Sequence, residues 1–116
     1  MFANLIMEIW KDTPGLTNLL LTGVDGIVIE KKNEIEEDEY VAAEAANLIK
    51  ECQRFGTEMG SGGLQFLTSQ FENKILAIQM VTDEYFLLGL LEDAKHLGRI
   101  RYSFNLKSYE WYSAIA

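Results

Sequence analysis

Apolar residues recur along the chain in two ways, at helical spacing in some segments and as short continuous runs in others. From Phe2 to Lys11 they stand at i, i+3, i+4, i+7 and i+8, which predicts an amphipathic helix that ends at Thr13-Pro14-Gly15. Strand-like runs follow at Leu16–Thr22 and Ile27–Glu30. The Asp25-Gly26 pair between these runs favours a tight hairpin turn.

A second helix is predicted at Tyr40–Met59, followed by strands at 64–71, 74–81 and 85–91. The last two strands are apolar almost throughout, which indicates a sheet with helices on each side. The connections between the strands are short, so these neighbours are expected to be antiparallel. A third helix is expected from about Glu92-Asp93, with a candidate break at 105–108. Residues 1–116 are therefore expected to form one α/β domain.

Two apolar stripes run along the predicted second helix. The first has spacings of 4, 3, 4, 3 and 4 residues and is expected to be buried; it consists of Val41, Ala45, Leu48, Cys52, Phe55 and Met59. The second consists of Ala42, Ala46 and Ile49. Its small side chains either allow another helix to approach closely, at a contact between subunits, or simply support helicity.

The strand at 64–71 mixes polar and apolar positions, as expected at an exposed or partner-paired edge of a sheet. Edge-to-edge pairing of two copies would satisfy its open backbone groups and place the two second helices side by side. The residues predicted to form this dimer interface are Ala42, Ala46, Ile49, Gln65, Leu67 and Ser69.

Charge and composition exclude several classes of function. Ten Lys and Arg against eighteen Asp and Glu give a net charge of −8, which is unsuited to nucleic-acid binding or to docking on an anionic membrane. No apolar run approaches the roughly 20 residues of a membrane span, and the N-terminal residues lack the basic region of a signal peptide. The one cysteine, Cys52, fits a reducing compartment. A soluble, cytoplasmic protein is expected.

An acidic run at Asn33–Glu39 precedes the second helix and is interpreted as a solvated loop. Negative charge is favoured at a helix start, so Asp38 or its neighbour is a candidate N-cap.

The sequence offers little that would catalyse a reaction. His96 is the only histidine and is expected to face solvent, and Cys52 lies within an apolar stripe. Gly60-Ser61-Gly62-Gly63 lacks the Lys-Ser/Thr of a phosphate-binding loop and follows a helix, so a helix C-cap and turn is predicted there. The acidic run lacks the spacing of a calcium loop. We therefore expect no catalytic residue, no cofactor and no metal.

The order of elements and three motifs carry a family resemblance. The motifs are Leu-Leu-Thr-Gly-Val-Asp-Gly-Ile-Val at 20–28, Ala-Ala-Glu-Ala-Ala-Asn-Leu at 42–48 and Leu-Gly-Arg-Ile-Arg at 97–101. Together they resemble the Roadblock / dynein light chain domain family, including the bacterial gliding-motility proteins that regulate a Ras-like GTPase. The likeness extends from Leu5 to about Trp111.

This resemblance implies a profilin-like α+β sandwich, with a five-stranded antiparallel sheet, one helix on one face and two on the other. It also implies a homodimer joined through the third strand and the second helix. Family members bind partners, as light-chain adaptors on dynein, as scaffold subunits, or as regulators that grip a small GTPase across the paired central helices. By that analogy the partner-facing residues are Glu44, Asn47, Lys50, Glu51, Arg54 and Glu58. The alternative is that these six form an ordinary charged helix face.

We thus expect a non-enzymatic homodimeric regulator or scaffold of a small Ras-like GTPase, with a GTPase-activating or co-regulator role. The alternatives are a light-chain-like adaptor without effect on nucleotide turnover, and a small-molecule sensor. The chain departs from the family pattern in its dense acidic run and its aromatic segment 102–112. No arginine is identifiable as a finger that reaches a nucleotide; Arg54, Arg99 and Arg101 are the candidates.

Overall fold

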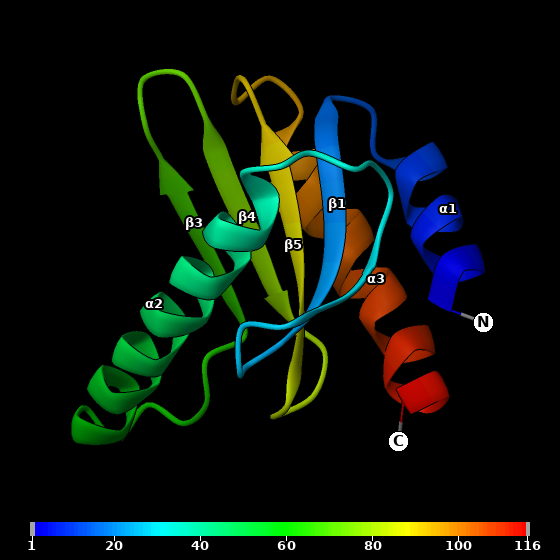
Figure 1. Ribbon diagram of the computed structural model, residues 1–116. Coiled ribbons are helices and arrows are strands. Elements are labelled where there is room, and N and C mark those ends of the chain that lie inside the picture. Colours follow the sequence, from blue (N-terminus) through cyan, green and yellow to red (C-terminus); the bar gives the residue numbers. More distant parts are fainter. Residues whose placement is uncertain (1, 116) are drawn as a thin grey trace.

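The computed structural model describes residues 2–115, which form three helices and five strands around one antiparallel sheet (Figure 1). In chain order the elements are α1 (Phe2–Asp12), β1 (Leu16–Gly23), β2 (Val28–Lys31), α2 (Asp38–Glu58), β3 (Phe66–Gln70), β4 (Ile75–Met80), β5 (Tyr85–Leu91) and α3 (Leu97–Ile115). The strand order across the sheet is β2-β1-β5-β4-β3, so β2 and β3 are the two edges. The predicted order of elements and the predicted fold class are both confirmed.

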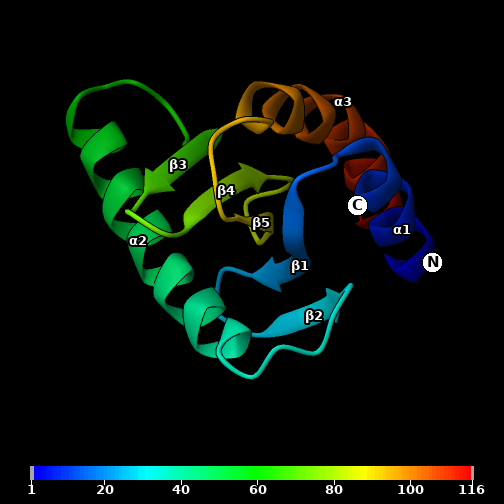
Figure 2. The ribbon, with the colours of Figure 1, turned by 90° about the horizontal axis from the view of Figure 1, so that it is seen from above.

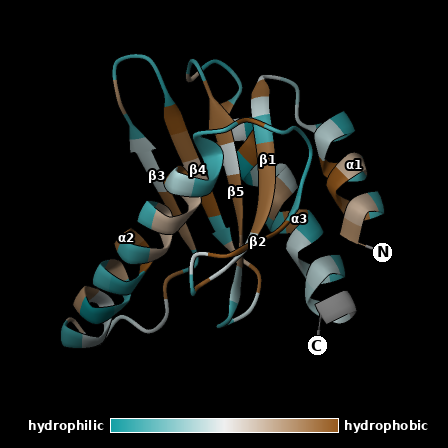
Figure 3. Cartoon of the chain, in the orientation of Figure 1, coloured by the Kyte–Doolittle hydropathy of each residue, from teal (hydrophilic) through white to brown (hydrophobic). Residues whose placement is uncertain are grey.

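The helices cover the two faces of the sheet unequally. Helices α1 and α3 lie on one face and α2 lies alone on the other (Figure 2). Each face has its own core, because the central strands β1, β4 and β5 are apolar on both sides (Figure 3).

On the two-helix face, the packing is close enough to require a small residue in the sheet. Gly89 lies in the middle of β5, and a Cβ there would come within 2.9 Å of the Phe104 ring in α3. The side chains of Ile100, Phe104 and Trp111 are fully buried against the sheet and α1. Trp111 also stacks on Phe2 of α1, with ring centroids 6.1 Å apart. These contacts join the first helix to the last.

The hairpin between β1 and β2 forms as predicted. Gly26 has a φ of 88°, the left-handed conformation that glycine adopts easily. The Asp25 side chain accepts a hydrogen bond from the Ile27 backbone N–H at 3.0 Å, which closes the turn.

The third helix differs from its prediction at both places that the sequence left uncertain. It begins at Leu97, not near Glu92-Asp93, because the Asp93 side chain accepts a hydrogen bond from the Lys95 N–H and holds a turn there. It also runs unbroken through 105–108. Ser108 donates its hydroxyl proton to the Asn105 carbonyl at 2.7 Å, so this polar segment is satisfied within the helix.

The predicted C-cap of α2 is confirmed. Gly60 has a φ of 68°. Its N–H donates to the Thr57 carbonyl, and the Ser61 N–H donates to the Gly56 carbonyl. This pair of bonds is the Schellman arrangement that ends a helix. Among the described residues, none of the helices combines the length and the apolar character that a bilayer crossing requires.

Candidate functional site: the outer side of α2 and the β3 edge

The face of α2 that packs on the sheet is the alanine stripe. Ala42, Ala46 and Ile49 are almost completely buried, together with Ala45, against apolar side chains of β1, β4 and β5. Alanine allows the helix backbone to lie close to the sheet, so the small side chains are used within the chain itself. The prediction that Ala42, Ala46 and Ile49 form a contact between subunits is therefore wrong.

The other apolar stripe of α2 is the one left at the surface. Leu48 is 37% exposed, Phe55 58% and Met59 61%, while Val41 and Cys52 are half-buried. Ala45 is buried and Val41 packs against the core, so the prediction that the stripe is buried is wrong for Leu48, Phe55 and Met59. Because α2 turns its alanines to the sheet, the stripe with the larger side chains lies along the flank of the helix. We call Val41, Leu48, Cys52, Phe55 and Met59 the α2 flank.

The α2 flank borders a groove beside the sheet edge. The groove has a volume of about 420 Å³ and lies between α2 and the β3 side of the sheet. Val41 and Leu48 line it from the helix, and Ser69, Phe71 and Leu76 line it from the strands. The Phe71 side chain is 60% exposed. The chain thus presents an apolar surface beside the open edge.

Strand β3 supplies that open edge, and its hydrogen-bonding pattern shows which groups are free. The Met80 N–H donates to the Gln65 carbonyl and the Phe71 N–H to the Lys74 carbonyl, both toward β4. Because antiparallel partners alternate, Leu67 and Ser69 also bond toward β4, and the backbone groups of Phe66, Thr68 and Gln70 point outward.

The three interface residues predicted on this strand are placed as follows. Gln65 is exposed and immediately precedes β3, Leu67 packs against the α2 core, and Ser69 lines the groove. Their part in a dimer stays a prediction. Together with the α2 flank they place the open edge and the apolar groove on the same side of the molecule.

The six residues predicted to face a partner are all exposed on α2. Arg54 bonds two of the others, Glu51 at 2.8 Å and Glu58 at 3.0 Å. The hydrogen bond and charge of Glu51, with a smaller contribution from Glu58, raise the pKa of Arg54 above its ordinary value. Arg54 is therefore held along the helix by two carboxylates. The role of the six residues, including Glu44, Asn47 and Lys50, as a partner surface stays a prediction.

The acidic run contains a buried network that sequence reasoning missed. Glu37, the neighbour of Asp38, occupies the N-cap position, but its side chain makes no capping bond. Asp38 is instead buried and accepts a hydrogen bond from the Asn18 side-chain amide at 2.6 Å. The Asn18 amide also donates to the Asn33 carbonyl, and its oxygen accepts from the N–H groups of Leu19 and Asn33. The available signal of this network in the sequence was Asn18, a polar residue inside the apolar run of β1.

Lys31 of β2 organises the exposed part of the same run. Its ammonium group lies 3.0 Å from a Glu34 carboxylate oxygen and 3.3 Å from one of Glu39. The hydrogen bond from Lys31 to Glu34 is the main cause that raises the pKa of Lys31 above 10.5. Lys31 thus binds Glu34 and Glu39, at the two ends of the exposed part of the acidic run. Glu36 and Glu37 lie exposed between these two residues.

The residues with chemical potential are not brought together. His96 is half-buried at the start of α3, where its ring packs against Gly15, and Cys52 lies in α2 on the other face of the sheet. Within the described residues, no group of three or more His, Cys, Asp or Glu side chains is placed to hold a metal ion.

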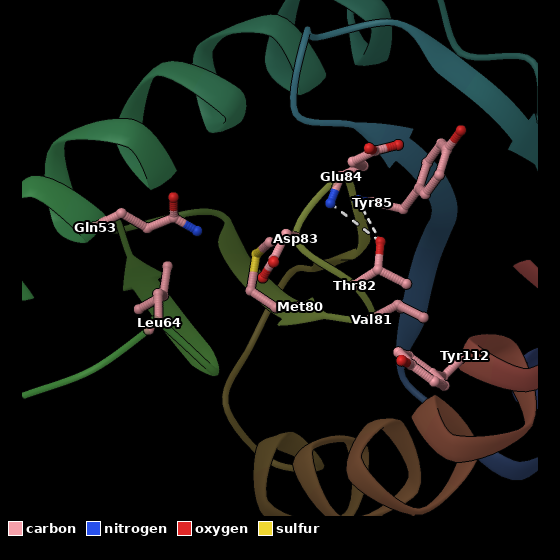
Figure 4. Close-up of a pocket in the computed structure, with 10 residues that line it drawn as sticks. Gln53, Leu64, Met80, Val81, Thr82, Asp83, Glu84, Tyr85 and Tyr112 are labelled. Atoms are coloured by element: carbon pink, nitrogen blue, oxygen red, sulfur yellow. Dashed lines mark hydrogen bonds between the residues drawn. The ribbon is translucent and has the colours of Figure 1, made fainter. Parts of the chain in front are cut away.

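A wide cavity of about 660 Å³ lies where the loop before β3 meets the β4–β5 turn and Tyr112 (Figure 4). One of its polar side chains, Thr82, serves the turn, because its hydroxyl oxygen accepts hydrogen bonds from the N–H groups of Glu84 and Tyr85. The cavity therefore shows no paired nucleophile and base. The α2–β3 side is the stronger candidate for a functional surface.

Several solved structures share this fold. A Roadblock/LC7 domain from Streptomyces avermitilis has a TM-score of 0.86 at 16% identity, over 97% of this chain and 96% of that one. MglB from Myxococcus xanthus has a TM-score of 0.86 at 14% identity, over 97% and 93%. The gliding protein MglB from Thermus thermophilus has a TM-score of 0.80 at 18% identity, over 90% and 81%.

Sequence comparison adds the family. No curated protein sequence matches the chain. The sequence model of the Roadblock/LC7 domain matches residues 3–92, from α1 through β5, which is well over half of the chain. This chain is a member of the Roadblock/LC7 domain family.

Proposed function

We propose that this chain is a non-enzymatic regulator or scaffold that pairs with a second copy of itself and binds a small Ras-like GTPase. The observation that carries the proposal is the open edge of β3 beside the exposed α2 flank. Pairing of two β3 edges would satisfy the outward backbone groups of Phe66, Thr68 and Gln70. The same arrangement would bring the two α2 flanks together and bury Leu48 and Phe55.

The spacing of the α2 flank supports this dimer. With Ala45 included, its members stand 3.6 residues apart on average, so they form one continuous line along α2 that a second helix can cover. Leu48, Phe55 and Met59 are exposed on one side of the helix, and contiguous exposed apolar surface is typical of interaction sites. A second α2 lying alongside would cover them.

Family membership and the likeness to the gliding protein MglB support the GTPase as the partner. In the proposed dimer the exposed charged residues of the two α2 helices would form one continuous surface for it. Arg54 is held by Glu51 and Glu58, so it is unsuited to reach into a nucleotide site. The chain would then act by favouring one conformation of the GTPase, which supplies its own catalytic groups.

The dimer is tested by changing one residue of the α2 flank. Leu48→Glu is expected to convert the dimer to a folded monomer, because a carboxylate in an apolar seam has no partner. Ala43→Glu is the matched control, since Ala43 is exposed on the opposite flank of the same helix. Sedimentation velocity measures the mass and circular dichroism the fold. A folded Leu48→Glu chain that remains dimeric contradicts this interface.

The GTPase is tested with a small Ras-like GTPase from the same organism, chosen from genes that adjoin this one where they exist. The initial rate of GTP hydrolysis is measured with and without the chain, and binding by calorimetry. We expect binding that Lys50→Glu weakens several-fold, because Lys50 is exposed on α2 and lies outside the groove. Lys11→Glu, on α1, is the control. A change in rate identifies a regulator, binding without a change identifies a scaffold, and no binding contradicts the proposal.

A further inference from the structure

The outer face of α3 carries exposed aromatic and apolar residues that the fold does not use. Tyr102 is 69% exposed, Leu106 55% and Tyr109 74%. They recur at i, i+4 and i+7, directly opposite the buried face formed by Ile100 and Phe104. We call Tyr102, Leu106 and Tyr109 the α3 stripe. It lies on the two-helix face of the sheet, away from the α2 flank (Figure 2).

The α3 stripe lies in the most basic part of an acidic chain. Residues 94–109 contain Lys95, Arg99, Arg101 and Lys107 and no Asp or Glu, although the whole chain has a net charge of −8. Lys107 pairs with Glu8 and Glu110. Arg101 lies over the Phe66 ring at 5.0 Å. Within the part of the chain that the structure describes, no ion pair joins Arg99 or Arg101 to a carboxylate. Two exposed guanidinium groups thus border an aromatic surface.

The complementary surface is present in the same chain. The connection at 32–37, between β2 and α2, carries Glu34, Glu36 and Glu37 around the exposed Ile35. Lys31 pairs with Glu34 and Glu39. In the described residues Glu36 and Glu37 have no such cation beside them. The connection therefore offers two unpaired carboxylates next to an apolar side chain.

The two complementary surfaces cannot meet within one molecule. The connection 32–37 leads into α2, and α3 lies on the opposite side of the sheet (Figures 1 and 2). We propose that a second copy of this chain docks its Glu36 and Glu37 on Arg99 and Arg101 of the α3 face, with Ile35 against the α3 stripe. This contact joins two different surfaces, so it can repeat from copy to copy.

This head-to-tail contact differs from the proposed dimer, because it uses neither the outward backbone groups of β3 nor the α2 flank. Arg101 is its one residue that touches β3, over the Phe66 ring. Exposed ion pairs each contribute little, because water and salt screen them. The contact is therefore expected to be weak and to appear only at high protein concentration. Burial of Ile35 and of the α3 stripe supplies the remaining attraction.

A charge exchange tests this contact. Sedimentation velocity of the full chain over a series of concentrations is expected to show species larger than the smallest stable unit. R99E/R101E and E36K/E37K, each alone, are expected to abolish these species, because each places like charges opposite one another. A mixture of the two variants is expected to restore them, since the reversed charges are complementary again. The control K11E/K50E changes the net charge as much as R99E/R101E, at exposed sites on α1 and α2 that belong to neither surface.

The series is repeated in the Leu48→Glu chain, where the proposed dimer contributes nothing, so the two assemblies are distinguished. Thermal unfolding by circular dichroism confirms that each variant is folded. The proposal is overturned if the wild-type chain shows no concentration-dependent growth, if the charge variants grow as the wild type does, or if their mixture does not recover. Growth lost equally in K11E/K50E would also overturn it, because net charge alone would then explain the effect.

Discussion

The two edge strands of the sheet are built in opposite ways. Strand β2 has four residues, two of them Glu30 and Lys31, and its pairing with β1 is interrupted by a bulge between Leu21 and Thr22. Strand β3 has five residues, none of them charged, and pairs with β4 in unbroken register. Short length, charge and bulges are the features by which sheets prevent further strand pairing. This sheet is therefore closed at β2 and open at β3.

The surroundings of the two edges differ in the same sense. Beyond β2, the chain is fixed by the Asn18 network and by Lys31 with its two glutamates. Beside β3 lie the groove and the exposed α2 flank. Polar interactions within the chain are concentrated at one edge, and apolar surface without a partner at the other. The polar groups near β2 are therefore satisfied within the chain, whereas the apolar surface beside β3 is where a second molecule would fit.

Loss of the Asn18 network at the closed edge is expected to have the largest effect. Asn18→Ala leaves the buried Asp38 carboxylate without its donor and frees the Asn33 backbone groups. We expect a loss of about 3 kcal/mol in the free energy of unfolding, the scale of a hydrogen bond to a buried charged group. Urea denaturation measures it. Asn73→Ala, in the exposed β3–β4 turn, is the control and should change little. Equal stability of the two variants would show that the network is dispensable.

A block at the open edge is expected to have a smaller but more selective effect. The N–H of Thr68 points away from β4, so Thr68→Pro removes no hydrogen bond within the sheet. We expect the chain to remain folded while self-association weakens at least tenfold, because the proline ring obstructs the second edge. Sedimentation equilibrium measures the dissociation constant. Thr68→Val, which keeps the N–H, is the control; equal dissociation constants for both variants would exclude strand pairing.

The smallest expected effect concerns Lys31 and its pH dependence. Since Glu34 and Glu39 raise the pKa of Lys31 in the folded chain, its stabilising contribution is complete below pH 10.5 and is lost as the pH rises through the higher folded value. Lys31→Gln should therefore flatten the alkaline fall of the unfolding free energy. Lys50→Gln serves as the comparison. Unfolding curves between pH 8 and pH 11.5 provide the measurement, and identical slopes for wild type and Lys31→Gln would contradict it.

The sequence predicted most elements closely because their signals are local. The helical spacing from Phe2, the Asp25-Gly26 turn and the apolar run Tyr85–Leu91 each specify one element without reference to another. The start of α3 was misplaced because a local turn at Asp93 competes with the helix. The exposure of the six polar α2 residues was also predicted, since such side chains on a helix face rarely pack inside.

The two stripes of α2 show where pattern reasoning failed. Both are apolar, and the larger side chains of the α2 flank appeared to be the better core. The alternation of 4 and 3 residues in that stripe, counted with Ala45, is typical both of a helix that packs on a sheet and of a helix that pairs with another, so the spacing alone could not decide. A helix on a sheet needs close approach, for which the alanines of the other stripe are suited. Asn18 was a local signal, as a polar residue inside an apolar run, but nothing local identified its partner Asp38, 20 residues further along the chain.

By itself, the sequence determined the order of helices and strands and the mixed polar character of β3, since these depend on residue type and short-range spacing. The tertiary structure decided which stripe of α2 meets the sheet, which carboxylate of the acidic run is buried, and that the open edge, the groove and the α2 flank share one side. Those features depend on the rotation of a helix about its axis and on contacts between distant segments. The packing of the whole chain determines both the rotation of α2 and the contacts between distant segments.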